Sequence, residues 1–161
     1  MILQKNLADK GFAISSVDKS DFDVYFEISR ACYEKYVNEY FDGWVDEFQL
    51  TMNTDAFNKE MGQSTFMKLL LNDEIVGFFA FDELGDKIDG VMIQMIETAR
   101  EKGFGSFYLN HITSIANNTN KSIFLQVFKS NPAKNLYERF GFTIYDESIS
   151  HYQMRYDPIS A

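Results

Sequence analysis

Three apolar runs in the middle of the chain limit what it can fold into. They cover residues 65–71, 75–83 and 88–96, and short segments containing Asn, Asp or Gly separate neighbouring runs. Apolar runs of this length, broken by such residues, are typical of strands joined by tight turns. The pattern predicts three consecutive strands, the first two of which form a hairpin.

Helices and strands are also predicted on both sides of this segment. The further predicted strands are residues 11–17, 122–127, 142–148 and 151–157, and the predicted helices are residues 22–36, 44–61, 104–117 and 132–140. Strand–helix–strand units are therefore mixed with hairpins. This order predicts an α/β (α+β) fold with a mixed sheet and helices on both faces.

Length, charge and hydropathy exclude several classes of protein. A chain of 161 residues, 45% of them hydrophobic, fits one domain with a well-packed core. The net charge of -9 opposes binding to phosphate backbones, so no nucleic-acid partner is expected. No apolar run approaches the ~20 residues of a membrane span, and the N-terminal residues do not form a signal peptide. We therefore expect a cytoplasmic protein with no membrane partner.

Cysteine and histidine chemistry is expected to play little part. Cys32 is the one cysteine, which excludes an internal disulfide, and its apolar neighbours indicate a buried thiol. His111, His151 and Cys32 have no metal-ligand spacing, so no metal is expected. His111 lies on the apolar face of the predicted helix 104–117, which favours a packed histidine over a base.

The segment 100-REKGFGSF-107 joins a predicted strand to a predicted helix. The first turn of a helix has free N–H groups and the positive end of the helix dipole, so it attracts anions. Glycine lets a phosphate approach the backbone closely. However, the Walker pattern is absent, and Tyr108 stands where a dinucleotide motif needs its third glycine. A phosphate site and glycines that only serve packing both remain open from these residues alone.

A second motif, 131-NPAKNLYERFGF-142, follows the next predicted strand. Together with R-x-x-G-x-G at 100–105, it resembles the GNAT superfamily of acyl-CoA N-acetyltransferases, and 41-FDGWVDEFQ-49 is similar to a segment of bacterial members with unassigned substrates. The resemblance implies one acetyltransferase domain over residues 1–161. It also implies a mostly antiparallel sheet of about seven strands whose fourth and fifth strands splay apart. The implied activity is transfer of acetyl from acetyl-CoA to a primary amine, by direct attack in a ternary complex.

The resemblance also implies which residues bind acetyl-CoA, the acyl-donor cosubstrate. Backbone N–H groups of the turn would bind the pyrophosphate, and the fourth strand would bind the pantetheine arm as an added strand would. Asn131 resembles the family asparagine that bonds the pantetheine, and Ser130 is the alternative. The implied donor-binding residues are Ile93, Met95, Ile96, Arg100, Glu101, Lys102, Gly103, Phe104, Gly105, Ser106, Ser130 and Asn131. We expect the Glu101 side chain to point to solvent.

Tyr137 is the implied general acid, which protonates the leaving thiolate; a buried core tyrosine is the alternative. Asp89 is the candidate base by its position on the fourth strand, although it also fits an ordinary turn aspartate. Asp82, Glu83 and a chain of water molecules are the other candidates. A backbone N–H near Met95 would hold the oxyanion.

The acceptor pocket is expected between the first two helices and the last hairpin. Tyr36, Phe41, Trp44 and Glu47 are the candidate acceptor-binding residues, with a core anchor as the alternative role of Trp44. The amine itself is not identified, although the acidic charge favours a cationic one, and a monomer or homodimer is expected. A non-catalytic acyl-CoA-binding module of the same fold, or an interaction protein, remains the alternative function.

Overall fold

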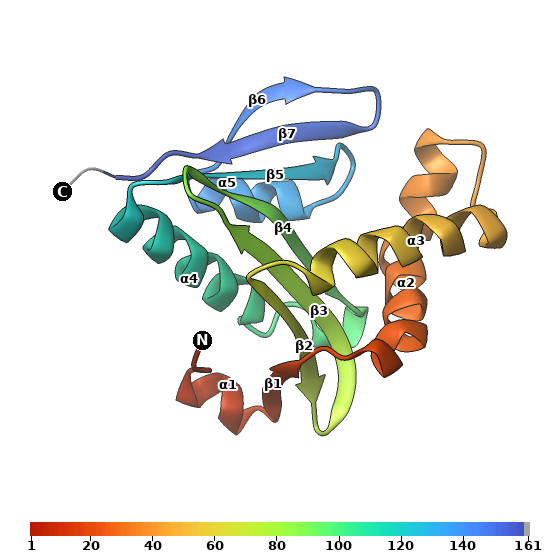
Figure 1. Cartoon of the computed structure of the whole chain (residues 1–161), viewed down its shortest axis with the longest axis horizontal. Coiled ribbons are helices and arrows are strands. Elements are labelled where there is room, and N and C mark those ends of the chain that lie inside the picture. Colours follow the sequence, from red (N-terminus) through yellow and green to blue (C-terminus); the bar gives the residue numbers. More distant parts are fainter. Residues whose placement is uncertain (160–161) are drawn as a thin grey trace.

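The structure, a computed structural model, describes residues 1–159 and is built around one seven-stranded sheet (Figure 1). The strands lie in the order β1-β2-β3-β4-β5-β7-β6. The strands are β1 (Phe12–Ser16), β2 (Thr65–Leu71), β3 (Glu74–Glu83), β4 (Lys87–Met95), β5 (Ser122–Phe128), β6 (Thr143–Glu147) and β7 (His151–Tyr156). The helices are α1 (Lys5–Asp9), α2 (Phe22–Tyr40), α3 (Asp46–Met61), α4 (Phe104–Thr119) and α5 (Ala133–Arg139). The predicted mixed sheet of about seven strands is confirmed.

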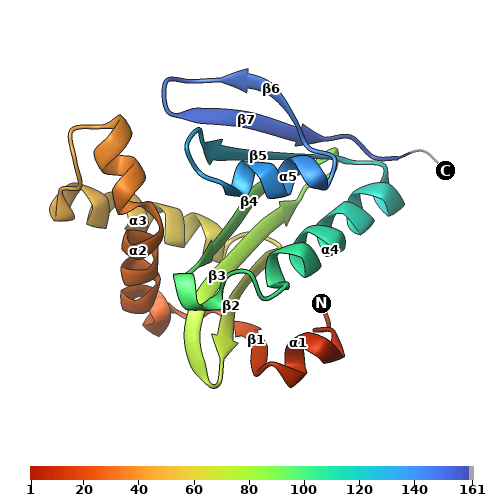
Figure 2. The same ribbon diagram turned by 180° about the vertical axis from the view of Figure 1, so that it is seen from behind.

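Strand pairing is antiparallel everywhere except between β4 and β5. These two strands are parallel, and they pair only at Lys87 with Ser122 and Ile88 with Ile123. Beyond Ile88 they run apart, as Figures 1 and 2 both show. The predicted splay of the fourth and fifth strands is therefore present, and it leaves backbone edges without partners in the middle of the sheet.

Helices cover both faces of the sheet, as predicted. The helices α1, α4 and α5 contribute Leu7, Tyr108 and Tyr137, among others, to the larger core cluster, while α2 and α3 contribute to a second cluster on the opposite face. Figure 2 shows α4 and α5 on the near side of the sheet. The second cluster is largely aromatic, with Tyr25 packed edge-on against Phe57 and Phe78.

A bulge interrupts β4 close to the point where β4 and β5 separate. Ala80 of β3 pairs with Met92, but Asp82, two residues on, pairs with Asp89, so β4 contains one extra residue. Gly90 lies in the bulge with φ of +60°, and a Cβ there would overlap the amide nitrogen of Gln63. The position therefore requires glycine both for its backbone conformation and for the side chain above it.

Two features differ from the sequence-based expectation. The short helix α1 was not predicted, because its single buried residue, Leu7, gives no apolar periodicity. The sequence pattern marks Phe48, Met52 and Phe57 as the apolar side of the predicted helix 44–61, which is the side expected to be packed. Only Phe57 is buried; Phe48 is 61% exposed and Met52 51% exposed. That expectation is wrong, because α3 faces the protein with a mostly polar stripe instead.

Candidate active site

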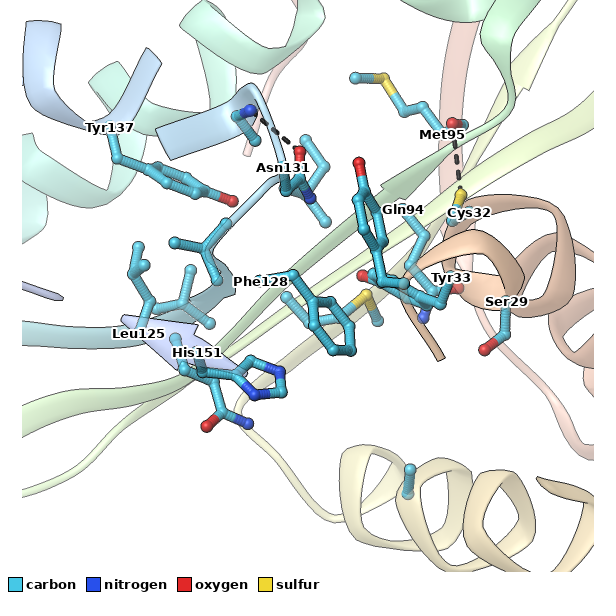
Figure 3. Close-up of a pocket in the computed structure, with 18 of the residues that line it drawn as sticks. Ser29, Cys32, Tyr33, Gln94, Met95, Leu125, Phe128, Asn131, Tyr137 and His151 are labelled. Atoms are coloured by element: carbon cyan, nitrogen blue, oxygen red, sulfur yellow. Dashed lines mark hydrogen bonds between the residues drawn. The ribbon is translucent and has the colours of Figure 1, made fainter. Parts of the chain in front are cut away.

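A groove of about 1670 Å³ follows the line along which β4 and β5 separate. Residues of α2, α3, β4, the start of α4, β5, α5 and β7 line it, and Figure 3 shows part of this lining. Sites for one drug-sized ligand have volumes of roughly 300–1,000 Å³. The groove therefore has room for two substrates, or for one long substrate.

The turn before α4 forms one end of this groove. Its residue Glu101 has φ of +58°, and Gly103, the N-cap of α4, has φ of +98° and no side chain capping the helix. Within residues 1–159, the backbone N–H groups of residues 101–106 donate to no other protein atom. Free N–H groups at a helix start, on a backbone held in an uncommon conformation, are the expected geometry of an anion site.

The two basic side chains of the turn serve different purposes from each other. The Nε of Arg100 donates to the carbonyl oxygen of Met95 at 2.7 Å, so this side chain ties the turn to the end of β4. Lys102 is exposed and does not line the groove, and its carbonyl accepts a hydrogen bond from Lys10 at 2.8 Å. Glu101 is exposed, as expected. Whatever binds here is therefore held chiefly by backbone groups.

The glycines of the motif also have a packing role. A Cβ at Gly105 would lie 3.2 Å from Leu136 Cδ2, so this glycine lets α5 approach the first turn of α4 closely. The Phe104 side chain is fully buried in the core, and only its backbone belongs to the turn. Packing and anion binding, which the sequence left as alternatives, are compatible in this geometry.

Ile93 and Met95 of β4, and Ile96 just after it, differ in whether their backbone groups already have hydrogen-bond partners. Ile93 and Met95 line the groove. The Met95 carbonyl already accepts hydrogen bonds from Arg100 and, at 3.4 Å, from the thiol of Cys32 (Figure 3). Ile96 does not line the groove: its N–H donates to Val76 and its carbonyl accepts from Ala99. The expected part of Ile96 is therefore not supported by this geometry.

Asn131 and Ser130, the two candidates for contacting the pantetheine, have different surroundings in the structure. Asn131 lines the groove, and its Oδ1 accepts a hydrogen bond from the N–H of Ala133 at 2.9 Å, which leaves its amide N–H groups for a ligand (Figure 3). Ser130 is exposed outside the groove, and its hydroxyl donates to Glu39 at 2.7 Å. The geometry favours Asn131 over Ser130 as a ligand-contacting residue.

Tyr137 extends from α5 into the groove (Figure 3). The residue is 8% exposed, and its ring packs against Phe142. Burial raises the pKa of Tyr137 to about 12 because the charged phenolate would be poorly solvated there. Its hydroxyl is therefore protonated at neutral pH and can donate a proton. Tyr33 of α2 enters the groove from the opposite side (Figure 3).

The carboxylates expected to act as a base lie at the start of β4 and the end of β3. Asp89 lines the groove, but it accepts a hydrogen bond from the Gly90 N–H at 2.9 Å and pairs with Lys87 at 3.3 Å. Asp82 accepts from the N–H of Ser64, and Glu83 pairs with Lys121, and neither lines the groove. Asp89 is thus the only one of the three that the structure brings to the groove.

Three of the four predicted acceptor-binding residues line the groove. Tyr36 is buried and stacks on Phe128 at 5.1 Å between ring centroids, and Phe41 is exposed at the mouth. Trp44 lines the groove and also donates from Nε1 to Asp46 at 2.9 Å. Glu47 is exposed at the first turn of α3 and does not line the groove. The structure therefore does not bring Glu47 to the site, because Glu47 lies on a different face of α3 from the residues that line the groove.

A buried carboxylate that was not predicted from the sequence, Glu60, lines the groove from α3. Glu60 is 9% exposed, and burial raises its pKa to about 7, an effect that the nearby Tyr25 hydroxyl opposes. Its Oε2 has no hydrogen-bond partner within residues 1–159, nor do the buried amide oxygens of Gln63 and Gln94. The available signal was the helical spacing of Gln49, Asn53 and Glu60, a polar stripe that an apolar pattern does not reveal.

Cys32 and His111 both pack against other side chains of the protein. Cys32 is buried, and desolvation raises the pKa of its thiol, which agrees with a packed residue. His111 packs near Phe81 outside the groove. Among the residues described, none form a group of His, Cys, Asp or Glu side chains suited to a metal ion. No helix in the described part of the chain is both long and apolar enough to cross a membrane.

Residues 26–142 match the model of the acetyltransferase (GNAT) family, which covers well over half of the chain. The chain belongs to the GNAT family. Its activity class is therefore acetyl transfer, and the resemblance expected from the two sequence motifs is confirmed. A comparison with curated protein sequences gives no significant match.

Solved structures of other acetyltransferases share the GNAT fold with this chain. The PaiA N-acetyltransferase of Thermoplasma acidophilum, in complex with coenzyme A, superposes with a TM-score of 0.69 at 16% identity, covering 91% of this chain and 98% of its own. The ribosomal-protein-S18-alanine N-acetyltransferase of Escherichia coli gives 0.64 at 19% identity, with 93% and 96% covered. YncA from Salmonella typhimurium, with its cofactor acetyl-CoA, gives 0.61 at 16% identity, with 94% and 96% covered. At such identities the similarity establishes the fold alone.

Proposed function

We propose that residues 1–161 form one N-acetyltransferase domain, which moves acetyl from acetyl-CoA to a primary amine by direct attack in a ternary complex. The observation that carries this proposal is the position of two features in one groove. The free N–H groups of residues 101–106 lie at one end, and the protonated hydroxyl of Tyr137 faces the interior. An anion-binding turn and a proton donor in one cavity match a phosphorylated donor with a thiolate leaving group.

The residues of the turn and of β4 fit coenzyme A. The N–H groups of residues 101–106, with Ser106 in the first turn of α4, would bind the pyrophosphate. The unpaired edge of β4 around Ile93 would bind the amide groups of the pantetheine arm as a neighbouring strand does, and the Asn131 amide lies on the opposite wall. The complexes of PaiA with coenzyme A and of YncA with acetyl-CoA support this choice of donor.

Tyr137 is the proposed general acid. Attack of an amine on the thioester carbon expels a thiolate, and the Tyr137 hydroxyl would transfer its proton to that sulfur. With a pKa of about 12, the Tyr137 hydroxyl stays protonated until the thiolate forms and accepts its proton. The low exposure of Tyr137 would limit the access of bulk water to the reacting atoms once both substrates fill the groove. Acetyl transfer to an amine is favoured over hydrolysis by this exclusion.

Two measurements test this function. First, coenzyme A is added to the protein at 100-fold its Kd, where mass action predicts about 2.7 kcal/mol of stabilisation in a thermal-shift experiment. Second, thiol release from acetyl-CoA is followed with a panel of primary amines. Tyr137→Phe is expected to lower kcat by roughly 10²–10⁴-fold while coenzyme A binding is unchanged. Tyr152→Phe, which alters a tyrosine outside the groove, is the matched control.

The two alternative functions give different results in these measurements. A non-catalytic module would bind coenzyme A but release no thiol with any amine, and Tyr137→Phe would change nothing. If millimolar coenzyme A gives no thermal shift, the anion-binding turn is only a packing feature, and the proposal fails.

A further inference from the structure

One face of α3 lines the groove along its length. The lining residues of this face recur at helical spacing: Val45, Phe48, Met52, Ala56 and Glu60. Exposure falls along the row, from 61% at Phe48 and 51% at Met52 to 9% at Glu60. The groove therefore opens at the start of α3 along an exposed apolar row, with the buried polar residues Gln49 and Asn53 beside it, and is closed at Glu60.

Three buried oxygen atoms without hydrogen-bond donors mark the closed end. They are Oε2 of Glu60, Oε1 of Gln63 and Oε1 of Gln94, and all three residues line the groove. Leaving a buried acceptor unpaired costs about 1–3 kcal/mol, and more for a charged group. Native structures rarely retain such atoms without a reason. These unpaired acceptor oxygens are suited to a ligand group that has only donors, and a primary ammonium is such a group.

The closed end also lies at the reactive part of the groove. The Gln63 side chain covers Gly90 in the β4 bulge, and Gln94 belongs to the same strand. Tyr33, Tyr137 and Glu60 all line this groove, and Tyr137 and Glu60 both help to raise the pKa of Tyr33, so both lie within electrostatic range of its hydroxyl. An amine held by Glu60 would therefore approach the segment of groove that Tyr137 also faces.

We propose that the acceptor is a primary amine carried on an apolar arm, with the arm lying along Phe48 and Met52 and the ammonium held and deprotonated by Glu60. This inference rests on the proposed acetyltransferase function and assigns the base that Asp89 was expected to provide. Asp89 is half-exposed, and both of its oxygens already have partners. Glu60 is buried, and one of its oxygens has no hydrogen-bond partner. That oxygen can accept a hydrogen bond from a cation, whose charge would also compensate the buried carboxylate.

The proton and bond changes balance with the groups named. Glu60 takes one proton from the ammonium and leaves a neutral amine. The amine nitrogen attacks the thioester carbonyl carbon, the carbon–sulfur bond breaks, and Tyr137 gives its proton to the sulfur. The second proton on the nitrogen returns to Tyr137 through water, and Glu60 releases its proton to solvent. The products are the N-acetyl amine, coenzyme A with a free thiol, and one proton.

The surroundings of Glu60 suit a base that works near neutrality. Desolvation raises the pKa of Glu60 to about 7, close to the pH at which a general base is most effective. Lys59, on the same helix, lowers that pKa, and the nearby Tyr25 and Tyr33 of α2 are neutral tyrosines. Lys35 of α2 and Arg100 also line the groove, but neither is among the causes that shift the Glu60 pKa.

The test compares Glu60→Gln with Asp55→Asn, which alters an exposed carboxylate on the same helix outside the groove. The probes are 2-phenylethylamine, 2-aminoethanol and 2-phenylethanol. Wild-type protein and Asp55→Asn should acetylate 2-phenylethylamine with at least tenfold higher kcat/KM than 2-aminoethanol. Glu60→Gln should lower this kcat/KM by roughly 10²–10⁴-fold. It should also abolish the acid limb of the pH profile near pH 7, whereas a merely structural role would leave the shape of the profile unchanged.

Binding is measured separately by calorimetry on the protein saturated with coenzyme A. 2-Phenylethylamine should bind the wild type at pH 8 and bind Glu60→Gln at least tenfold more weakly, while 2-phenylethanol should bind both equally weakly. Equal binding or equal turnover in the two proteins overturns the inference, as does a preference for 2-aminoethanol. If amines are acetylated and only Tyr137→Phe is slow, this inference fails and the proposed function stands. If coenzyme A does not bind, the proposed function itself fails.

Discussion

Replacing Glu60 with glutamine should make the protein more stable at neutral and alkaline pH. Burial raises the pKa of Glu60 from 4.5 to about 7 in the folded protein. An unfolded chain therefore loses this proton near pH 4.5, whereas the folded protein keeps it until about pH 7. The favourable contribution of the protonated carboxyl is complete below about pH 4.5 and is lost as the pH rises to 7.

The size of this effect follows from the shift in pKa. At about 1.4 kcal/mol per pKa unit, the ionised carboxylate costs the folded state about 3 kcal/mol above pH 7. For a domain of this size, roughly 2–4 °C in Tm corresponds to each kcal/mol. Glu60→Gln removes the ionisation, so its advantage over the wild type should grow by about 3 kcal/mol between pH 4.5 and pH 8.5.

Urea unfolding at several pH values between 4.5 and 8.5 measures this difference. The single tryptophan, Trp44, is a fluorescence probe, and circular dichroism is a second one. The comparison uses the change with pH, so a constant offset from the new amide cancels. Shifts at exposed carboxylates such as Asp18 and Asp157 act equally in both proteins. A difference that changes by less than about 1 kcal/mol over this range would show that Glu60 is hydrated, and would refute the reasoning.

Two further predictions concern the turn and the bulge. Gly103→Ala should destabilise the fold by roughly 1–3 kcal/mol, because φ of +98° is strained for alanine even though its Cβ would lie 3.7 Å from Leu7 without a clash; urea unfolding measures the loss, and the affinity for coenzyme A should fall with it. Tyr108→Phe removes a buried hydroxyl that lies 2.7 Å from the Ala80 carbonyl oxygen and 3.3 Å from that of Met92. The expected cost is about 1–3 kcal/mol in the same assay, and an unchanged midpoint would contradict it.

The order of strands and helices was predictable because its signals are local. The run 75–83 is apolar throughout and is followed by turn residues, and helix α4 repeats apolar residues every three or four positions. The splay of β4 and β5 was predicted only through the family resemblance, since no residue type marks where parallel strands separate. The helix α1 was missed because it is too short to show a period.

The sequence indicates candidate site residues where glycines mark an unusual backbone, and it does not reveal side chains whose properties come from burial. The turn at 100–106 is marked by its glycines, so the sequence located it. Glu60 stands next to Lys59 in a polar helix, and in the sequence it looks like a surface residue. It is buried only because α2 packs beside it and places Tyr25, far away in the sequence, against it. No sequence pattern indicates that Arg100 Nε donates to the Met95 carbonyl oxygen, because that contact depends on the fold.

The separation of β4 and β5 also has a mechanical meaning. The sheet is two smaller sheets, β1–β4 and β5–β7–β6, which share only the pairs at Lys87–Ser122 and Ile88–Ile123. A donor whose amide groups pair with the free edge of β4 would hold the two smaller sheets together. The two halves should then exchange their backbone hydrogens with solvent more slowly, and more in concert, when the donor is bound. In that state the molecule would be closest to a continuous sheet, and the thioester would lie between its two halves.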